Sequence, residues 1–324
     1  MKSVSVFMDV EDPINPLADD AARDFGELFS AAGVSGSFCV TGEKCRTLLQ
    51  RGRHDVLRVL APHAHGLHTD THSFHPSTME LLADCEFAEG CERAYVTESR
   101  GARAFEAAFG RLPSFWGGAG NSWSPEITDV LRRLGVNAYA YALTKLPGEA
   151  IHRFNGVLAL PQAISISETD WMDDERAASA MDRAMARIAA LNQPWVGIFV
   201  GHPTKMRYAD YWDKPYYAGR TPPDPEFAEP VPDVAYERAK ANLTIFLARL
   251  AAVAEILPAP AAIALPWTFR PPTEAERDYF VEQTSANLRS VIGWPIHRPG
   301  LDAENIVAKT LAKMGTLEVG EIKG

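Results

Sequence analysis

Residues 3–12 read SVSVFMDVED, an apolar run that ends in three carboxylates within four residues. The run predicts a β-strand over Ser3–Met8. Asp9, Glu11 and Asp12 stand at its carboxyl end, where parallel sheets carry their binding and catalytic groups. Three anions packed together repel one another unless a cation or a basic group lies among them. The segment therefore predicts a functional site, and a polar loop with a helix-capping aspartate is the alternative.

Helix-like and strand-like segments alternate over the first two hundred residues. The helix-like segments are Leu17–Ala32, Glu43–Leu60, Pro125–Leu134 and Asp173–Leu191, and the strand-like segments are Gly36–Val40, Val157–Leu160 and Trp195–Val200. Farther on, Ala235–Ile256 predicts a long helix and Ala261–Leu265 predicts a last strand. This alternation predicts an α/β fold in which helices wrap a parallel sheet or barrel.

One long segment, Lys205–Asp233, has neither a helical nor a strand period. It is rich in Tyr, Trp, Pro and Asp, and a loop of this length in a compact chain is typical of a lid. Its aromatic rings are expected to stack on the rings of a ligand, or to pack against the barrel or a neighbouring subunit. We expect a barrel over residues 1–266, with residues 205–234 as a lid-like insertion, and a C-terminal extension, residues 267–324, that packs on the barrel.

The composition excludes several classes of protein. The 324 residues include 42 acidic and 32 basic side chains, a formal charge of −10, whereas a nucleic-acid-binding protein needs a basic face. No run of about 18 apolar residues predicts a membrane span, and the first residues lack the apolar region of a signal peptide, so we expect a cytoplasmic protein. The four cysteines lack C-x-x-C spacing and are expected to be free thiols. The oligomeric state stays open, a homo-oligomer included.

Five of the nine histidines lie in one stretch, PHAHGLHTDTHSFHP at residues 62–76. His68 and His72 are four positions apart, so one helical turn would place both imidazoles on one face, as a metal ion needs. His202 follows the predicted strand that ends at Val200, and it lies at the same end of the sheet as the acidic cluster. The pattern predicts a metal site, with a solvated histidine-rich loop as the alternative.

Taken in order, these elements resemble the NodB-homology polysaccharide deacetylases, carbohydrate esterase family 4. Six pieces in the family's order cover residues 3–204. They are MDVEDP at residues 8–13, which is similar to a D-V-E-D form of the first acidic motif, GSFCVTG at 36–42, HAHGLHTDTH at 63–72, PSFWGGAGNSWSPE at 113–126, Asp170-Trp171, and FVGH at 199–202.

The resemblance implies a distorted (β/α)7-type barrel with its site at the carboxyl ends of the strands. It also implies that His68 and His72 bind a divalent metal together with Glu11 or Asp12, because the register of the D-V-E-D form leaves these two carboxylates open. Zn²⁺ is the expected metal, with Co²⁺, Ni²⁺ or Mn²⁺ as alternatives. Two histidines and one carboxylate leave positions free for water and substrate, as a catalytic metal site requires.

The activity that the resemblance implies is removal of an N-acetyl group from an amino sugar or glycan precursor. The metal would polarise the amide carbonyl and activate a water molecule, from which Asp9 takes a proton as general base, while His202 protonates the leaving nitrogen as general acid. Trp116, Trp171 and Phe199 are expected to contact the substrate, the last two at the acetyl group.

One departure from the family concerns the base. The family's third motif carries an arginine that positions the catalytic aspartate, and Trp116 stands there instead. Arg111 or Lys205 is a candidate replacement. A catalytically impaired, carbohydrate-binding pseudo-deacetylase is the alternative that this loss supports. A hydrolase of another non-peptide C–N bond, resembling the allantoinases, is a further alternative, although retention of His68 and His72 argues against a metal-free version.

Overall fold

The computed structural model describes residues 2–140, 145–292, 302–313 and 316–322. Within these residues twelve strands form one sheet. They are β1 (Lys2–Val10), β2 (Ser37–Val40), β3 (Ala64–Leu67), β4 (Phe115–Gly117), β5 (Ala138–Ala140), β6 (His152–Phe154), β7 (Val157–Leu160), β8 (Gln162–Ser165), β9 (Trp195–Phe199), β10 (Ala254–Ile256), β11 (Trp267–Arg270) and β12 (Leu317–Ile322).

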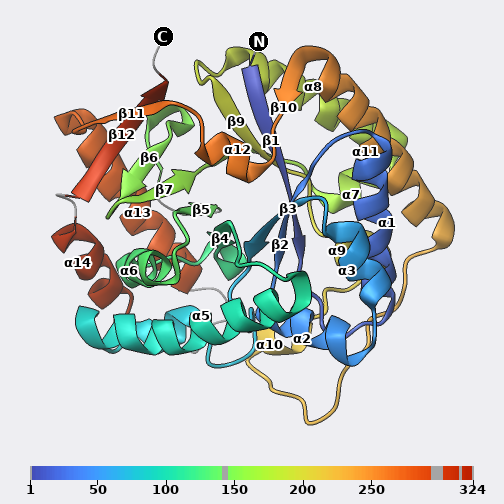
Figure 1. The fold of residues 1–324 in the computed structure, drawn as a ribbon, viewed down its shortest axis with the longest axis horizontal. Helices are drawn as coiled ribbons and strands as arrows, with labels where there is room; N and C mark the ends of the chain where they lie inside the picture. Colours follow the sequence, from blue (N-terminus) through green and yellow to red (C-terminus); the bar gives the residue numbers. More distant parts are fainter. Residues whose placement is uncertain (1, 141–144, 293–301, 314–315, 323–324) are drawn as a thin grey trace.

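The sheet follows the order β11-β12-β6-β7-β5-β4-β3-β2-β1-β9-β8, and β10 pairs with β1 off this path. Neighbours from β8 through β1 to β7 are all parallel. The remaining strands β6, β12 and β11 run antiparallel to their neighbours. The parallel part is curled, and β1 is one of its inner strands, running toward the middle of the molecule (Figure 1). The carboxyl ends of its strands therefore meet at one end of the barrel, as the α/β pattern predicted.

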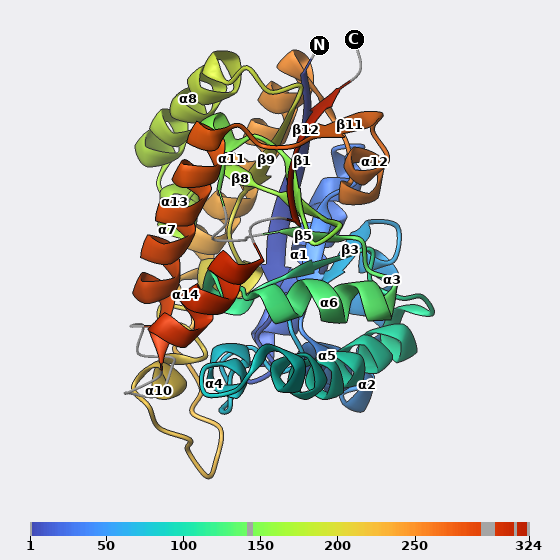
Figure 2. The same ribbon diagram turned by 90° about the vertical axis from the view of Figure 1, so that its left-hand side faces the viewer.

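Helices cover the outside of this sheet, as Figures 1 and 2 show. They are α1 (Leu17–Ala31), α2 (Gly42–Gln50), α3 (His54–Leu60), α4 (Thr78–Leu82), α5 (Phe87–Phe109), α6 (Pro125–Leu134), α7 (Glu168–Trp171), α8 (Asp174–Ala190), α9 (Pro203–Arg207), α10 (Lys214–Tyr217), α11 (Asp233–Val253), α12 (Ala259–Ile263), α13 (Glu274–Ile292) and α14 (Ala303–Ala312), with short 3-10 turns at Ala119–Asn121 and Pro147–Glu149. No helix in the described part of the chain combines the length and the apolar character that a bilayer crossing needs.

Strand β1 is buried on both of its faces. Its even-numbered positions, such as Val6 and Met8, pack in the large cluster shared with the surrounding helices. Phe7 belongs instead to a second cluster, where its ring lies 5.7 Å from that of Phe115 and 6.5 Å from that of Trp195. Because side chains alternate along a strand, Asp9 lies on the same face as Phe7. The strand pleat thus directs an acid into the barrel at its carboxyl end.

Two predicted elements differ from the structure. The helix predicted over Glu43–Leu60 is interrupted between α2 and α3, where Gly52 adopts a φ of +66° that ends the first helix. The strand predicted over Ala261–Leu265 is wrong, because this alanine-rich run forms the short helix α12. The neighbouring strand is β10, which the sequence assigned to the end of a helix and which pairs with Lys2–Val4 of β1.

Residues beyond 266 share the sheet with the barrel. Strand β12 pairs antiparallel with β6, with Val319 opposite His152, and β11 pairs with β12. A buried ion pair ties α14 to α6, since Lys309 Nζ lies 2.5 Å from Glu126 Oε1. The extension therefore continues the barrel sheet by backbone hydrogen bonds.

Candidate metal centre

A cavity of about 220 Å³ opens at the carboxyl ends of the parallel strands. Strand β1, the loops after β3, β4 and β9, and the segment after α9 all contribute to its wall. Five of the acidic and histidine residues singled out in the sequence line it, namely Asp9, Glu11, His68, His72 and His202. The structure thus brings together residues from positions 9 to 202 of the chain.

Glu11, His68 and His72 converge on one point. Glu11 Oε2 lies 2.8 Å from His68 Nε2 and 2.9 Å from His72 Nε2. All three side chains are buried, with Glu11 only 1% exposed. These three groups meet the geometric condition for sharing a metal ion, since their ligand atoms lie close to one another.

The two histidines reach this point from a loop. His68 directly follows β3, and its backbone N–H donates to Val40 O at 2.9 Å. The chain then turns through Thr69 and His72, whose φ angles are +56° and +53°. The Thr69 side chain accepts the His72 N–H at 3.0 Å. The expected helical turn is therefore wrong, and two left-handed residues bring the imidazoles together instead.

Hydrogen bonds at Nδ1 orient both imidazoles. His68 Nδ1 donates to Gly117 O at 3.0 Å. His72 Nδ1 hydrogen-bonds to Ser73 Oγ, whose hydroxyl donates to the Asp213 carboxylate. Because Nδ1 carries the proton in each ring, Nε2 keeps its lone pair toward Glu11 when the ring is neutral. This is the tautomer that a metal ligand needs.

The arrangement fits a divalent cation. Glu11 is buried, its Oε1 lacks a hydrogen-bond partner among the described residues, and its Oε2 faces the Nε2 atoms of two imidazoles, an arrangement that is costly unless a cation or a proton lies among these groups. Metal–ligand bonds of about 2.0–2.1 Å place adjacent ligand atoms roughly 3 Å apart, close to the separations seen here. Burial alone would lower the pKa of His68, but the Asp9 and Glu11 carboxylates raise it to about 9. The site thus attracts positive charge.

Asp9 and His202 flank the three converging groups. Asp9 Oδ2 lies 3.6 Å from His68 Nε2 and 3.7 Å from His202 Nε2. Asp9 Oδ1 is buried without a hydrogen-bond partner in the described structure. Burial raises the pKa of Asp9, against the opposing effect of the nearby imidazoles. The pair therefore offers one basic oxygen and one imidazole at the edge of the candidate metal position.

Glu168 fixes His202 on the other side. His202 Nδ1 bonds to Glu168 Oε1, which also accepts the His202 backbone N–H at 3.1 Å. Burial alone would lower the pKa of His202, but the carboxylates of Glu11 and Glu168 raise it. Gly201 makes this contact possible, because a Cβ there would lie 2.7 Å from Glu168 Cγ and its φ is +108°. Glu168 thus favours the protonated imidazole.

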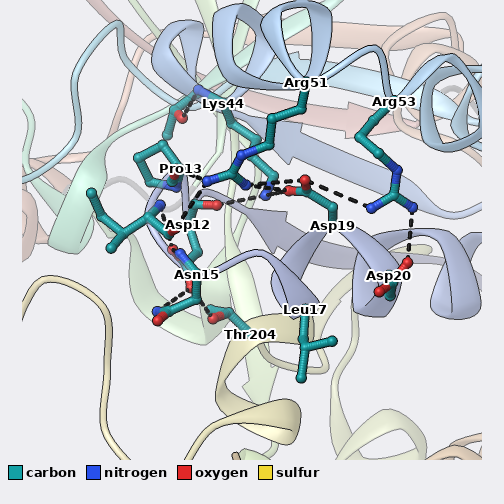
Figure 3. Close-up of polar contacts among 12 residues, drawn as sticks. Asp12, Pro13, Asn15, Leu17, Asp19, Asp20, Lys44, Arg51, Arg53 and Thr204 are labelled. Atoms are coloured by element: carbon teal, nitrogen blue, oxygen red, sulfur yellow. Dashed lines mark hydrogen bonds and ion pairs between the residues drawn. The ribbon is translucent and has the colours of Figure 1, made fainter. Parts of the chain in front are cut away.

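Asp12 does not face the converging groups. Its Oδ1 accepts the backbone N–H groups of Ile14 and Asn15 at 2.8 and 2.9 Å. Its Oδ2 accepts the Asn15 side-chain amide at 2.9 Å and the Thr204 hydroxyl at 2.5 Å. Figure 3 shows these contacts. Asp12 therefore shapes the turn after β1 and links it to α9, next to His202.

Buried charges hold the same turn from the side of α2. Lys44 Nζ lies 2.5 Å from Asp12 O and 2.5 Å from Asp19 Oδ1, and its side chain is 1% exposed. Arg51 binds the second Asp19 oxygen at 3.0 Å and donates to Pro13 O at 2.9 Å (Figure 3). These ties fix the backbone that presents Glu11 to the cavity.

Two of the three expected substrate contacts lie outside the cavity. Trp171 is fully buried, donates to Val200 O at 2.8 Å and packs against Phe246. Trp116 is also buried and donates to Glu98 Oε2 at 2.9 Å. Only Phe199 lines the described cavity wall. The tryptophans therefore support the wall from behind.

The arginine of the third family motif has no direct replacement at Asp9. Arg111 donates to Ala61 O and to His65 Nδ1, in the loop before β4 at the opposite end of the strands. Lys205 lines the cavity, with its Nζ 4.0 Å from the Tyr211 ring centroid. Within the described residues, the charged partners of Asp9 are imidazoles alone.

Sequence reasoning missed two supporting residues, Glu168 and Asp213, and the partner of Ser73. Glu168 follows β8, a strand that the hydrophobic pattern did not predict. Its position at the carboxyl end of a parallel strand, where functional groups gather, was therefore not visible in the sequence. Ser73 stood in the histidine-rich stretch without an assigned partner. Asp213 reaches Ser73 across 140 positions, and burial raises its pKa to about 6. No local signal pairs two residues so far apart.

Comparisons with known proteins bear on the fold. Neither a protein-family model nor a curated protein matches the chain by sequence. A structure from Mycobacterium smegmatis assigned as a polysaccharide deacetylase is similar, with a TM-score of 0.51 and 14% identity over 81% of this chain and 87% of that one. A family 4 carbohydrate esterase from Streptomyces lividans in complex with acetate gives 0.43 and 12% identity over 76% and 88% of the chains. A family 4 pseudoenzyme from Bacillus anthracis gives 0.41 and 11% identity over 79% and 63%.

The Mycobacterium smegmatis comparison agrees with the sequence motifs. It confirms the expected barrel, and it confirms at the level of the fold the resemblance that six motifs in order had indicated. The chain therefore has the fold of the NodB-type polysaccharide deacetylases.

Proposed function

We propose that the chain is a metal-dependent hydrolase that removes an N-acetyl group from an amino sugar or glycan precursor. One observation carries this proposal: Glu11, His68 and His72 converge in the cavity, with Asp9 and His202 beside them. The deacetylase fold and the order of the sequence motifs support the same reaction. The cavity of about 220 Å³ is smaller than most ligand pockets, so it suits one sugar residue better than a long chain.

Glu11, His68 and His72 would hold the metal, through a carboxylate oxygen and the Nε2 atom of each ring. Imidazole and carboxylate ligands suit Zn²⁺, and Co²⁺, Ni²⁺ or Mn²⁺ are the alternatives. A bound divalent cation would polarise the amide carbonyl and lower the pKa of a water from 15.7 toward about 7. Asp12 is excluded from the proposed ligand set because both of its oxygens already accept hydrogen bonds.

Asp12→Asn and Glu11→Gln are therefore expected to behave differently. Glu11→Gln removes the anionic ligand, and we expect its metal content after dialysis to fall to background. Asp12→Asn is expected to keep the metal, but to lower the free energy of unfolding by about 2–4 kcal/mol because a buried charged acceptor is lost. Metal analysis and urea denaturation measure the two effects. Loss of metal from Asp12→Asn, with retention in Glu11→Gln, would reverse the assignment.

Asp9 is proposed as the general base and His202 as the general acid. The free Oδ1 of Asp9 can accept a proton from the attacking water, and its raised pKa makes it a stronger base than an exposed aspartate. His202, whose pKa is raised by the Glu11 and Glu168 carboxylates, can donate from Nε2 to the leaving nitrogen when its ring is protonated. Together these residues remove and return one proton, so that the amide becomes acetate and a free amine.

The Glu168–His202 pair predicts a change in pH dependence. Glu168 raises the pKa of His202, so activity that needs the protonated ring persists to higher pH and falls as pH rises through that pKa. We expect Glu168→Gln to move this basic limb of the kcat profile to lower pH. Asp170→Asn is the matched control, because Asp170 lies on the same helix but pairs with Arg176. An unmoved limb in Glu168→Gln, or an equal move in both variants, would refute the role.

A pseudo-deacetylase is the second candidate. It is favoured by one observation, the absence of a lysine or arginine partner for Asp9 among the described residues. Metal analysis followed by acetate release from N-acetylglucosamine and its short oligomers separates the two functions. A hydrolase releases acetate in proportion to bound metal. If the protein binds metal and sugar but releases no acetate from any N-acetylated sugar, it is a carbohydrate-binding protein without deacetylase activity. Hydrolysis of allantoin instead would show that the enzyme cleaves a C–N bond outside amino sugars.

A further inference from the structure

Among the described residues that line the cavity, Lys205 is the one lysine, and there is no arginine. Its Nζ lies 4.0 Å from the Tyr211 ring centroid, and this contact holds the ammonium without neutralising it. Among the residues that the structure describes, no carboxylate forms an ion pair with Lys205. A half-buried cation without an anionic partner is costly unless a ligand supplies the anion.

Two carboxylates that attract Lys205 electrostatically, Glu168 and Asp213, stand outside the described cavity lining. Glu168 accepts two hydrogen bonds from His202. Asp213 accepts the Ser73 hydroxyl. Neither carboxylate forms an ion pair with Lys205 in the described part of the chain, so the ammonium, which lines the cavity, stays available to a ligand there.

A second donor in the cavity lining, Gln162, also lacks an acceptor among the described residues. Gln162, at the start of β8, lines the cavity, and its Nε2 is buried without a hydrogen-bond partner among the described residues. An amide N–H left in this state is expensive, whereas an oxygen-rich ligand would satisfy it. The ammonium of Lys205 and the amide of Gln162 both donate. Fully ionised phosphate and carboxylate groups only accept hydrogen bonds, so they suit these two donors.

The position of Lys205 indicates which part of the substrate carries the anion. Lys205 lies three residues after His202 in the first turn of α9, and its N–H donates to His202 O at 3.1 Å. The Tyr211 ring that holds Lys205 also lies 5.5 Å from the His202 ring. His202 is the proposed donor to the leaving nitrogen, and that nitrogen carries the sugar. The ammonium is thus on the sugar side of the scissile bond.

We propose that Lys205, assisted by Gln162, binds an anionic group on the sugar. The substrate class is then N-acetylated amino sugars that carry a phosphate or a carboxylate. This inference rests on the proposed deacetylase function for the side of the bond, but the binding of the anion itself does not require hydrolysis. Lys205 is a specificity-determining residue in this scheme and takes no part in proton transfer.

The test compares charged and neutral ligands that the enzyme cannot deacetylate. Glucosamine 6-phosphate, muramic acid and glucosamine are titrated into the metal-loaded protein by calorimetry. We expect the better anionic ligand to bind about 10- to 100-fold more tightly than glucosamine, and Lys205→Gln to remove that preference. Lys205→Arg should retain most of it. The matched control is Lys214→Gln, because Lys214 lies in the same segment but is exposed and paired with Asp210.

The relative affinities of the three ligands decide whether Lys205 binds an anion. Equal affinity for all three ligands, or a preference that survives Lys205→Gln, overturns the inference. If glucosamine 6-phosphate binds more tightly than muramic acid, the anionic group on the substrate is a phosphate. If muramic acid binds more tightly, it is a carboxylate. The acetylated forms of the same sugars then report hydrolysis separately. A Lys205-dependent preference without acetate release refutes the deacetylase and leaves the anion site. An equal fall in kcat for charged and neutral acetylated sugars in Lys205→Gln would place the lysine at Asp9 and overturn the anion site.

Discussion

Replacing His72 with alanine is expected to remove the bound metal and to lower kcat/KM by roughly a thousandfold or more. Its Nε2 lies 2.9 Å from Glu11 Oε2, and the His68 Nε2 lies 2.8 Å from the same oxygen. Without His72, the other two groups provide too few ligands to hold the metal. Metal content of the purified variant and acetate release under saturating metal measure the effect. A variant that hydrolyses as fast as the parent would refute the assigned role.

His75→Ala provides the control for this experiment. His75 belongs to the same histidine-rich stretch, but it bonds to Glu80 at 2.9 Å and to Tyr216 O at 3.3 Å, outside the cavity lining. We expect this variant to keep its metal and its activity. Equal loss in both variants would point to disruption of the whole loop, and melting curves of the two proteins would show it.

Asp9→Asn is expected to keep the metal and to lower kcat by about 10²- to 10⁴-fold. Asparagine has nearly the same shape as aspartate, but it cannot accept the proton that Oδ1 is placed to receive. Stopped assays of acetate release, with metal analysis on the same samples, separate chemistry from binding of the cation. Asp12→Asn is the matched control in the same acidic cluster.

Two outcomes would contradict this role for Asp9. Loss of metal would make Asp9 a ligand, an arrangement that the proximity of Asp9, Glu11 and His202 also allows. Undiminished turnover would assign the base to another group. Because Asp12 faces the turn and Asp9 faces the cavity, only Asp9→Asn is expected to change kcat strongly.

The sequence predicted which strand ends meet, because parallel strands place their carboxyl ends at one edge of the sheet. That rule was enough to bring Asp9, His68 and His202 into one cavity. The choice between Glu11 and Asp12 stayed open in the sequence. Side chains alternate only within a strand, and both residues follow β1, which ends at Val10.

Other features depend on contacts that sequence spacing does not encode. Thr69 and His72 adopt left-handed backbone conformations, which residues other than glycine rarely adopt, so local propensity does not predict them. The run Ala261–Leu265 has apolar composition that suits a buried strand or a helix, and its length does not separate the two. Asp213 and Ser73 meet only after the lid-like segment folds over the barrel.

The strands beyond the barrel have a practical consequence. A chain shortened at residue 266 would lose β12 and expose the backbone N–H and C=O groups of β6, a ready template for pairing with another copy. Glu126 would keep its buried carboxylate but lose the cation of Lys309. Truncation would thus move the open edge of the sheet from β11 to β6 and is expected to lower the stability of the chain, although the described cavity lining includes none of the last segments.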